Sequence, residues 1–160
     1  MSEARVVNAS PLILFARIGR LELLEGSAPA LLIPDAVVEE VRRGQEKDRT
    51  AITVLEWSER HRVTDIAIPA SIEHWDLGSG ESQVIAHATL GPRWAVLDDR
   101  AARRCAAAHN VPVIGSLGVA LRCKRCGLID KARPLLLRLI EAGMYLDERF
   151  LEDALNTVGE

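Results

Sequence analysis

Short apolar runs alternate with longer helix-forming segments along almost the whole chain, and this alternation most constrains its fold. Proline and glycine punctuate the helical segments, as where Pro34 opens one and Gly44 stops it. Strands that alternate with helices indicate a mostly parallel sheet covered on both faces. We therefore expect an α/β fold with three layers, helix on sheet on helix. The expected strands are 4–8, 30–33, 62–68, 94–97 and 111–114.

The expected helices fill the intervals between these strands and continue beyond the last one. The first begins at Ser10 and Pro11 and is broken by Gly19, and a brief turn over 20–24 follows it. Two terminal helices are expected either to pack on the domain or to form a dimer surface, because 133–143 is rich in leucine. The remaining expected helices are 34–43, 51–60, 81–90, 99–109, 117–126, 131–142 and 147–158.

Size and charge restrict the class of protein. A chain of 160 residues fits a single domain over 1–160. Its net charge of −3 excludes a positive field over the whole protein, so any contact with nucleic acid needs a local basic patch. No stretch approaches the ~20 apolar residues of a membrane span, and the start shows no signal peptide. Three cysteines, an odd number, favour reduced thiols and a cytoplasmic location.

Two neighbouring carboxylates, Asp98 and Asp99, follow the strand at 94–97, and Asn8 ends the first strand. Ligands of such sheets gather at the carboxyl ends of the strands. Adjacent carboxylates repel unless a cation offsets their charge, and oxygen ligands of this kind suit Mg²⁺. The alternative is structural: Asp98 caps the following helix and Asp99 adds favourable charge to its first turn.

Two glutamates lie beside the apolar faces of their helices. At 100° per residue, Glu40 borders the face formed by Val37 and Val41, whereas Glu39 points toward water. Glu81 continues the apolar face of its helix into the first turn. Each glutamate taken alone is also explained as a solvated residue or as a favourable charge at a helix N-terminus.

Taken together, these stretches make the chain resemble a PIN domain, within a branch of prokaryotic predicted nucleic-acid-binding proteins related to VapC-type toxins. No single stretch is specific, but the set occurs in order across nearly the whole chain. The resemblance implies a three-layer α/β/α PIN-like fold whose acids gather at one edge of the sheet and hold Mg²⁺ or Mn²⁺. The matching stretches are VVNASPLILFARIGRLELL, IPDAVVEEVRRG, LGSGESQVIAHA, VLDDRAARRCAAAHNVPVIGSLGVALRCKRCGLI and LIEAGMYLDERFLEDAL.

The resemblance also assigns roles to residues. It implies a Mg²⁺- or Mn²⁺-dependent endoribonuclease, with a small antitoxin protein and a second copy of the chain as expected partners. Local arginines would hold the RNA phosphates. The implied catalytic residues are Asn8, Glu40, Glu81, Asp98 and Asp99, of which the four acids are the metal ligands. Ser10 and Ser116 are the implied hydrogen-bond donors that fix the carboxylates, and the RNA-binding residues are Arg43, Arg100, Arg103 and Arg104.

One departure from the family pattern leaves a second function open. Asn8 is neutral where most PIN domains carry their first aspartate, and loss of one charge weakens metal binding. The alternative is a PIN scaffold that binds RNA or a protein partner without cleaving. A phosphate-accepting receiver domain is disfavoured, because its acid pair follows the first strand and a lysine follows the last; here no lysine comes after Ile114 until Lys124.

The only C-x-x-C pair, Cys123 and Cys126, has no second pair nearby, so a structural role is favoured over zinc.

Overall fold

A five-stranded sheet forms the centre of the molecule. The computed structural model describes residues 3–160, and its strands are all parallel in the order β3-β2-β1-β4-β5. The central pair is in register from Ala4 beside Arg93 to Val7 beside Val96. The strands are β1 (Ala4–Val7), β2 (Leu31–Pro34), β3 (Arg62–Val63), β4 (Arg93–Val96) and β5 (Val113–Ile114).

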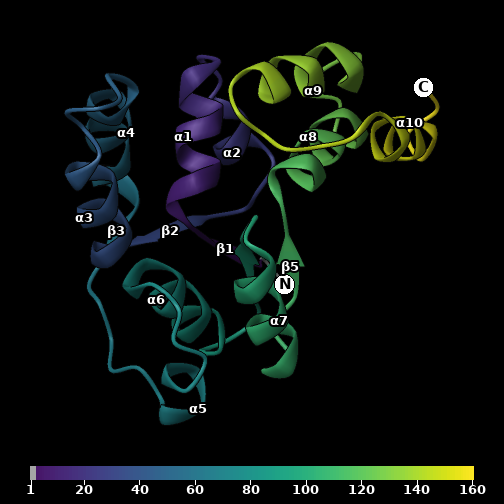
Figure 1. Ribbon diagram of the computed structural model, residues 1–160. Helices are drawn as coiled ribbons and strands as arrows, with labels where there is room; N and C mark the ends of the chain where they lie inside the picture. The colour runs from purple at the N-terminus through teal and green to yellow at the C-terminus, as the bar shows by residue number, and fades with distance from the viewer. Residues whose placement is uncertain (1–2) are drawn as a thin grey trace.

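Helices cover both faces of this sheet (Figure 1). Figure 1 shows α1, α2, α8 and α9 on one side of the strands, with α5, α6 and α7 on the other. The three-layer α/β/α architecture expected from the alternating pattern is therefore confirmed. The helices are α1 (Ala9–Arg17), α2 (Glu22–Gly26), α3 (Asp35–Arg43), α4 (Thr50–Ser58), α5 (Ala70–Glu73), α6 (Ser79–Ala88), α7 (Arg100–Ala108), α8 (Ser116–Arg125), α9 (Ala132–Glu141) and α10 (Glu148–Asn156), with a 3-10 turn at Glu59–His61.

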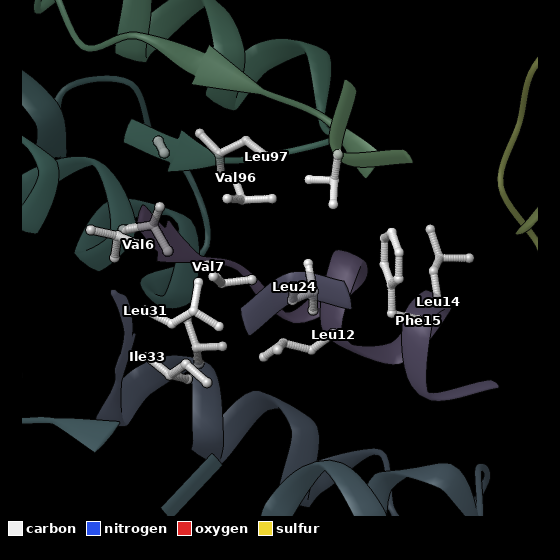
Figure 2. Packing of buried hydrophobic residues seen from close by; sticks show 14 of the residues in the cluster. Val6, Val7, Leu12, Leu14, Phe15, Leu24, Leu31, Ile33, Val96 and Leu97 are labelled. Atoms are coloured by element: carbon white, nitrogen blue, oxygen red, sulfur yellow. The ribbon is translucent and has the colours of Figure 1, made fainter. Parts of the chain in front are cut away.

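The apolar core lies between the sheet and these helices (Figure 2). Val6 and Val7 on β1 and Leu97 after β4 are fully buried, and Phe15 and Leu12 of α1 pack against the same cluster. Burial of such side chains stabilises the fold by roughly 1.5–3 kcal/mol each. Because the central strands are buried on both faces, their ends hold a fixed position for the polar residues that follow.

Three expected elements differ from the structure. The expected turn over 20–24 is largely the short helix α2, and α5 was not anticipated. The expected strand over 62–68 pairs only at Arg62 and Val63, because β3 is an edge strand with a single neighbour, β2. The rest of the expected strand is a loop, and its backbone bonds a side chain rather than a neighbouring strand. Ile66 N donates to Gln83 Oε1 at 3.0 Å.

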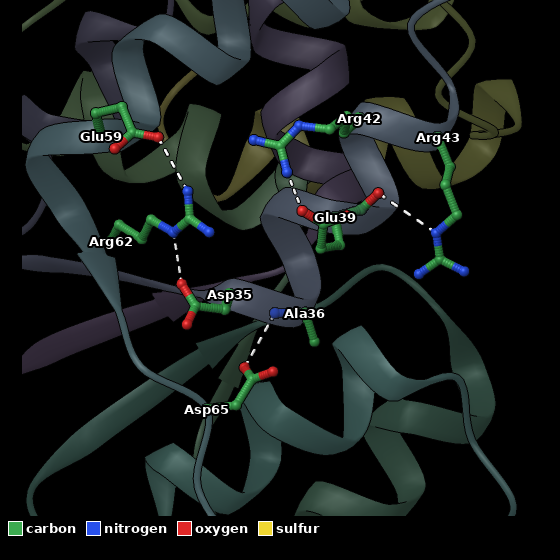
Figure 3. Close-up of polar contacts among 8 residues, drawn as sticks. All are labelled: Asp35, Ala36, Glu39, Arg42, Arg43, Glu59, Arg62 and Asp65. Carbon is green, nitrogen blue, oxygen red and sulfur yellow. Dashed lines mark hydrogen bonds and ion pairs between the residues drawn. The ribbon is translucent and has the colours of Figure 1, made fainter.

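The position of α3 is fixed by polar contacts at its start (Figure 3). Its N-cap residue is Pro34, which offers no side-chain cap. Asp65, from the loop after β3, instead accepts a hydrogen bond from Ala36 N at 3.0 Å. Further along, Glu39 is exposed and pairs with Arg42, as expected for a residue that points toward water. This cap from a distant loop fixes the helix that carries Glu40.

A similar distant cap stabilises α9. Glu160 accepts hydrogen bonds from Ala132 N at 2.6 Å and Arg133 N at 3.2 Å, and it pairs with Lys124 Nζ at 2.8 Å. These contacts, the Lys124 bond first among them, lower the pKa of the Glu160 carboxyl to about 2.

Replacing Glu160 with glutamine is expected to lower the melting temperature at pH 7 and to have progressively less effect in acid. A carboxyl with a lowered pKa contributes stability above its ordinary pKa, 4.5, and loses that contribution as the pH falls toward about 2. Thermal unfolding of both proteins between pH 7 and pH 3 measures the difference. Glu141→Gln, an exposed change on α9, the helix that Glu160 caps, is the control. A difference that is independent of pH would contradict the charge-based account.

No helix within residues 3–160 combines the length and apolar character needed to cross a membrane.

Candidate active site

Two polar residues follow the central strands of the sheet, at the point where the chain connections diverge. The connections from β1 lead outward through β2 to β3, whereas β4 leads to β5 on the other side. Asn8 directly follows β1, and its backbone N–H donates to Val96 O on β4 at 3.2 Å. Asp98 follows β4 by two residues. Open parallel sheets bind ligands at such a point, outside the carboxyl ends of the strands.

A cleft of about 990 Å³ opens at this point. Its lining combines residues that are far apart in the sequence, contributed by α1, α3, α6 and the segment after β4. The structure thus brings most of the expected site residues around one hollow. Those among the cleft-lining residues are Asn8, Ser10, Glu40, Glu81, Asp98 and Arg103.

The paired aspartates have different environments. Asp98 accepts two hydrogen bonds from Ser116, at 2.7 Å from its backbone N–H to Oδ1 and at 2.6 Å from its hydroxyl to Oδ2. Ser116 opens α8 and is fully buried, so it holds the Asp98 carboxylate in one orientation. Asp99 is the N-cap of α7, where its Oδ2 accepts from Ala102 N at 2.9 Å. The structural alternative of a capping Asp98 is therefore wrong, because Asp99 is the cap.

Asn8 and Glu40 approach each other around a glycine at the start of α6. A Cβ atom on Gly80 would lie 3.1 Å from Glu40 Oε2 and 3.5 Å from Asn8 Oδ1. Asn8 is only 4% exposed, and its Oδ1 accepts no hydrogen bond from any of residues 3–160. An unpaired buried oxygen of this kind destabilises the protein by roughly 1–3 kcal/mol unless a ligand or water satisfies it. The amide oxygen is therefore an unsatisfied acceptor buried beside Glu40.

The pKa of Glu81 is affected by burial and by the neighbouring acids. Burial raises the pKa of its carboxyl, and the negative charges of Asp99 and Glu40 raise it further. Asp99 does not line the main cleft, but this effect shows that its charge reaches Glu81. A cation placed among the three carboxylates would offset the repulsion.

The donor set fits a divalent cation that retains water. Within residues 3–160, no three acidic, histidine or cysteine side chains stand close enough together to form a complete metal cluster by themselves. The acids therefore surround the cleft more loosely than the expected direct four-ligand set. Mg²⁺ is usually held by one or two carboxylates and several waters, and all the available donors here are oxygens. The unpaired Asn8 oxygen and the repulsion on Glu81 are both consistent with such a group.

The expected basic residues separate into two groups. On α7, Arg100, Arg103 and Arg104 border a second hollow of about 450 Å³ that also includes Asp98. Arg103 lines both hollows, and its Nη1 would lie 2.8 Å from a Cβ on Gly115. By contrast, Arg43 lies at the end of α3, where Nε donates to Glu39 O at 3.4 Å, and it lines neither hollow.

Ser10 differs from Ser116 in its surroundings. It is exposed and lines the cleft, but within the described chain its hydroxyl bonds none of the acidic side chains. The expected role of Ser10 in fixing a carboxylate therefore has no counterpart among these contacts.

The sequence reading missed several residues around the cleft. Gly80 and Gly115 allow close approach to Glu40 and Asp98, respectively. Arg17 and Asp48 pair at 2.7 Å within the cleft wall, and Tyr145 lies on its border. No local pattern singles these residues out, although the stretch that contains Tyr145 is one of those that resemble a PIN domain.

Comparison with known proteins identifies the family. A family model described as a PIN domain matches residues 4–160, almost the entire chain. No curated protein matches the chain. The match supports a nuclease in general, a class that generally uses divalent metal ions. The parallel sheet and the acids beside the carboxyl ends of β1 and β4 agree with this match. The chain belongs to the PIN domain family.

Proposed function

We propose that the protein is a metal-dependent endoribonuclease that hydrolyses phosphodiester bonds in RNA. The observation that carries this proposal is the arrangement of Asn8, Glu40, Glu81 and Asp98 around one cleft at the β1–β4 edge. Family membership supports a nuclease, and the side-chain oxygens of these four residues are suitable ligands for a divalent cation.

Asp98, Glu81 and Glu40 would hold the cation, directly or through water, with Asp99 contributing charge from the start of α7. When bound, Mg²⁺ or Mn²⁺ would polarise a phosphoryl oxygen and lower the pKa of a water molecule. Ser116 keeps both oxygens of Asp98 hydrogen-bonded, so this carboxylate is oriented before any ligand arrives. The buried Asn8 oxygen has no partner and lies beside Glu40, so it would accept a hydrogen bond from a water molecule that enters between them.

The arginines on α7 would hold the RNA backbone. Arg100, Arg103 and Arg104 are exposed, and none of their side chains forms an ion pair with an acid in residues 3–160. Free guanidinium groups beside the acidic cleft supply affinity for phosphate without reading sequence, and this affinity falls with salt. Arg43 would contact RNA only outside the two hollows.

Cleavage of a labelled RNA pool tests the proposal. The wild-type protein is incubated with Mn²⁺ and with EDTA, and the variant Glu40→Gln/Glu81→Gln, purified in parallel, is incubated with Mn²⁺. The variant keeps the size of both side chains and removes two charges. Cleavage only by the wild-type protein with Mn²⁺ is expected. Equal cleavage in all three samples would indicate a contaminating nuclease and overturn the assignment.

A PIN scaffold that binds RNA or a protein without cleaving it is the second candidate, and the neutral Asn8 favours it. In that case RNA retention on a filter would persist while no sample shows products. Both readouts from the same preparation distinguish a scaffold from a misfolded enzyme.

We further propose that the enzyme is the toxin of a toxin–antitoxin module in the cytoplasm, held inactive by a small antitoxin protein. The support is the resemblance to the VapC group together with an open cleft that a partner could close. Co-expression with the product of the neighbouring gene is expected to relieve growth inhibition and to yield a co-purified complex.

A homodimer is also proposed, through the terminal helices 131–158. Leu135, Leu136 and Leu139 of α9 are buried within the chain, whereas Leu137, Tyr145 and, on α10, Phe150 are exposed. Light scattering that gives a particle of 17.5 kDa at micromolar concentration would contradict the dimer.

A further inference from the structure

The cleft extends well past the acidic residues to an apolar end. This end is built from α1, α8 and the segment that joins α9 to α10. Its volume of about 990 Å³ is at the upper limit of small-ligand pockets, roughly 300–1,000 Å³, so a cation and its waters fill only part of it. The residues of the apolar end are Ile13, Leu14, Leu117, Leu121, Met144 and Leu146.

The segment between α9 and α10 begins at a polar contact with α1. Arg17 Nη1 donates to Ala142 O at 2.7 Å, while the same guanidinium pairs with Asp48 at 2.7 Å. At the other end, Asp147 caps α10 by accepting from Phe150 N at 2.9 Å. The start of the segment is therefore held against α1, and its end leads directly into α10.

Tyr145 lies in the middle of this segment. Its neighbours Met144 and Leu146 are half-buried against the core, whereas Tyr145 is 95% exposed although it borders the cleft. An aromatic ring presented in this way has a free face for another planar group. A hydrophobic role in the fold does not account for it.

We propose that Tyr145 stacks on an unpaired base of single-stranded RNA whose phosphate backbone reaches the acidic end of the cleft. The inference rests on the proposed function, because it names the form of RNA that the site takes. Every base has an aromatic face, so stacking is independent of sequence. Bases in a duplex already stack on their neighbours, which leaves no face for the ring.

The charges around the cleft agree with this occupant. Arg103 lies beside Asp98 at the acidic end and forms no ion pair in the described chain, whereas Arg17 in the opposite wall is already paired with Asp48. A strand that reaches Arg103 would place a phosphate beside its guanidinium group while a base covers the apolar surface. Single-stranded RNA carries both kinds of group in every nucleotide.

The chain contains one tyrosine, which makes the test specific. Protein labelled with 3-fluorotyrosine gives a single ¹⁹F resonance, that of Tyr145. It is titrated in EDTA, where no cleavage occurs, with a 12-nucleotide single-stranded RNA and with the corresponding duplex, while fluorescence anisotropy measures binding. A resonance that shifts upfield with the single strand alone supports stacking. An unshifted resonance with bound RNA, an equal shift with the duplex, or no binding overturns it.

Matched variants separate the ring from its hydroxyl. Tyr145→Ala is expected to weaken single-strand binding roughly 5- to 150-fold, the range of one base stack, whereas Tyr145→Phe retains the binding. Trp75→Ala, also an exposed aromatic but outside the cleft lining, is the control and is expected to have no effect.

The outcome is distinguishable from failure of the proposed function. If wild type and Tyr145→Ala cleave RNA with the same KM, the stacking role is wrong and the nuclease assignment stands. If no sample cleaves RNA but the ¹⁹F resonance shifts with the single strand, the stacking role stands and cleavage is wrong.

Discussion

Asp98→Asn is expected to lower the rate of RNA cleavage roughly 10²- to 10³-fold while leaving the melting temperature almost unchanged. Loss of charge at a cation that stabilises the transition state corresponds to several kcal/mol, at 1.36 kcal/mol for each tenfold change. The effect should appear mainly in kcat, because the α7 arginines that bind phosphate are untouched.

The contacts of Asp98 explain why the fold should tolerate this change. An asparagine side chain in its place could accept the hydrogen bond from Ser116 N with its carbonyl oxygen. Its amide could donate to the Ser116 hydroxyl, which can rotate to accept. Shape and hydrogen bonding are therefore retained and only the charge is removed. A loss of cleavage without a loss of stability isolates the electrostatic role.

Asp99→Asn is the matched control, since it removes a charge one residue away. Asparagine is as good an N-cap as aspartate, so α7 should keep the bond that its cap makes to Ala102 N. We expect a smaller reduction, within about tenfold, because Asp99 does not line the main cleft. Single-turnover rates with Mn²⁺ and unfolding curves measure both variants. Wild-type cleavage by Asp98→Asn would remove this residue from the proposed site.

The fold could be predicted from the sequence where local patterns and tertiary packing agree. Central strands such as β1 and β4 are mainly apolar, with one arginine each, because both faces of the sheet are covered. Helix α3 ends at the glycine that marks its stop. The pattern fails at the margin of the sheet. The alternating run after Arg62 pairs only briefly, since an edge position provides one neighbour and the loop's backbone finds a side-chain partner instead.

The candidate site could be predicted only in outline. Strand-end position and helical periodicity select Asn8, Asp98, Glu40 and Glu81, and the structure places all four around the cleft. The sequence could not show that Asp99 caps α7 while Asp98 bonds Ser116, because this depends on Ser116, which follows another strand, lying next to Asp98. The looser spacing of the acids likewise depends on how α3 and α6 pack, which no local pattern encodes.

Asn8→Asp is expected to lower stability strongly without Mn²⁺ and much less with it. The two side chains have nearly the same size, so the change introduces a charge without altering packing. At position 8 this charge is buried. It lies near the Glu40 carboxylate, because the side-chain oxygens of both residues are close to Gly80. Without a cation we expect a destabilisation of roughly 3 kcal/mol, or a fall in melting temperature of about 6–12 °C.

With millimolar Mn²⁺ this loss of stability should become smaller. A negative oxygen in place of a neutral one adds a stronger ligand for the cation, so we expect the affinity for Mn²⁺ to rise at least about tenfold. A ligand that binds only the folded state stabilises it in proportion to the logarithm of its concentration over Kd. The variant should therefore gain more melting temperature from Mn²⁺ than the wild-type protein does, and its cleavage rate at low Mn²⁺ should be higher.

Titration of pH and metal together separates this account from a simple packing defect. A buried acid is neutral once protonated, so without Mn²⁺ the difference in stability between variant and wild type should narrow as the pH falls and widen as it rises. Asn110→Asp makes the same chemical change at an exposed position and should show neither effect. Melting curves for the three proteins, with EDTA and with Mn²⁺, measure both dependences. If Asn8→Asp is equally stable in EDTA and in Mn²⁺, the oxygen of residue 8 does not face a cation and the proposed metal site is wrong.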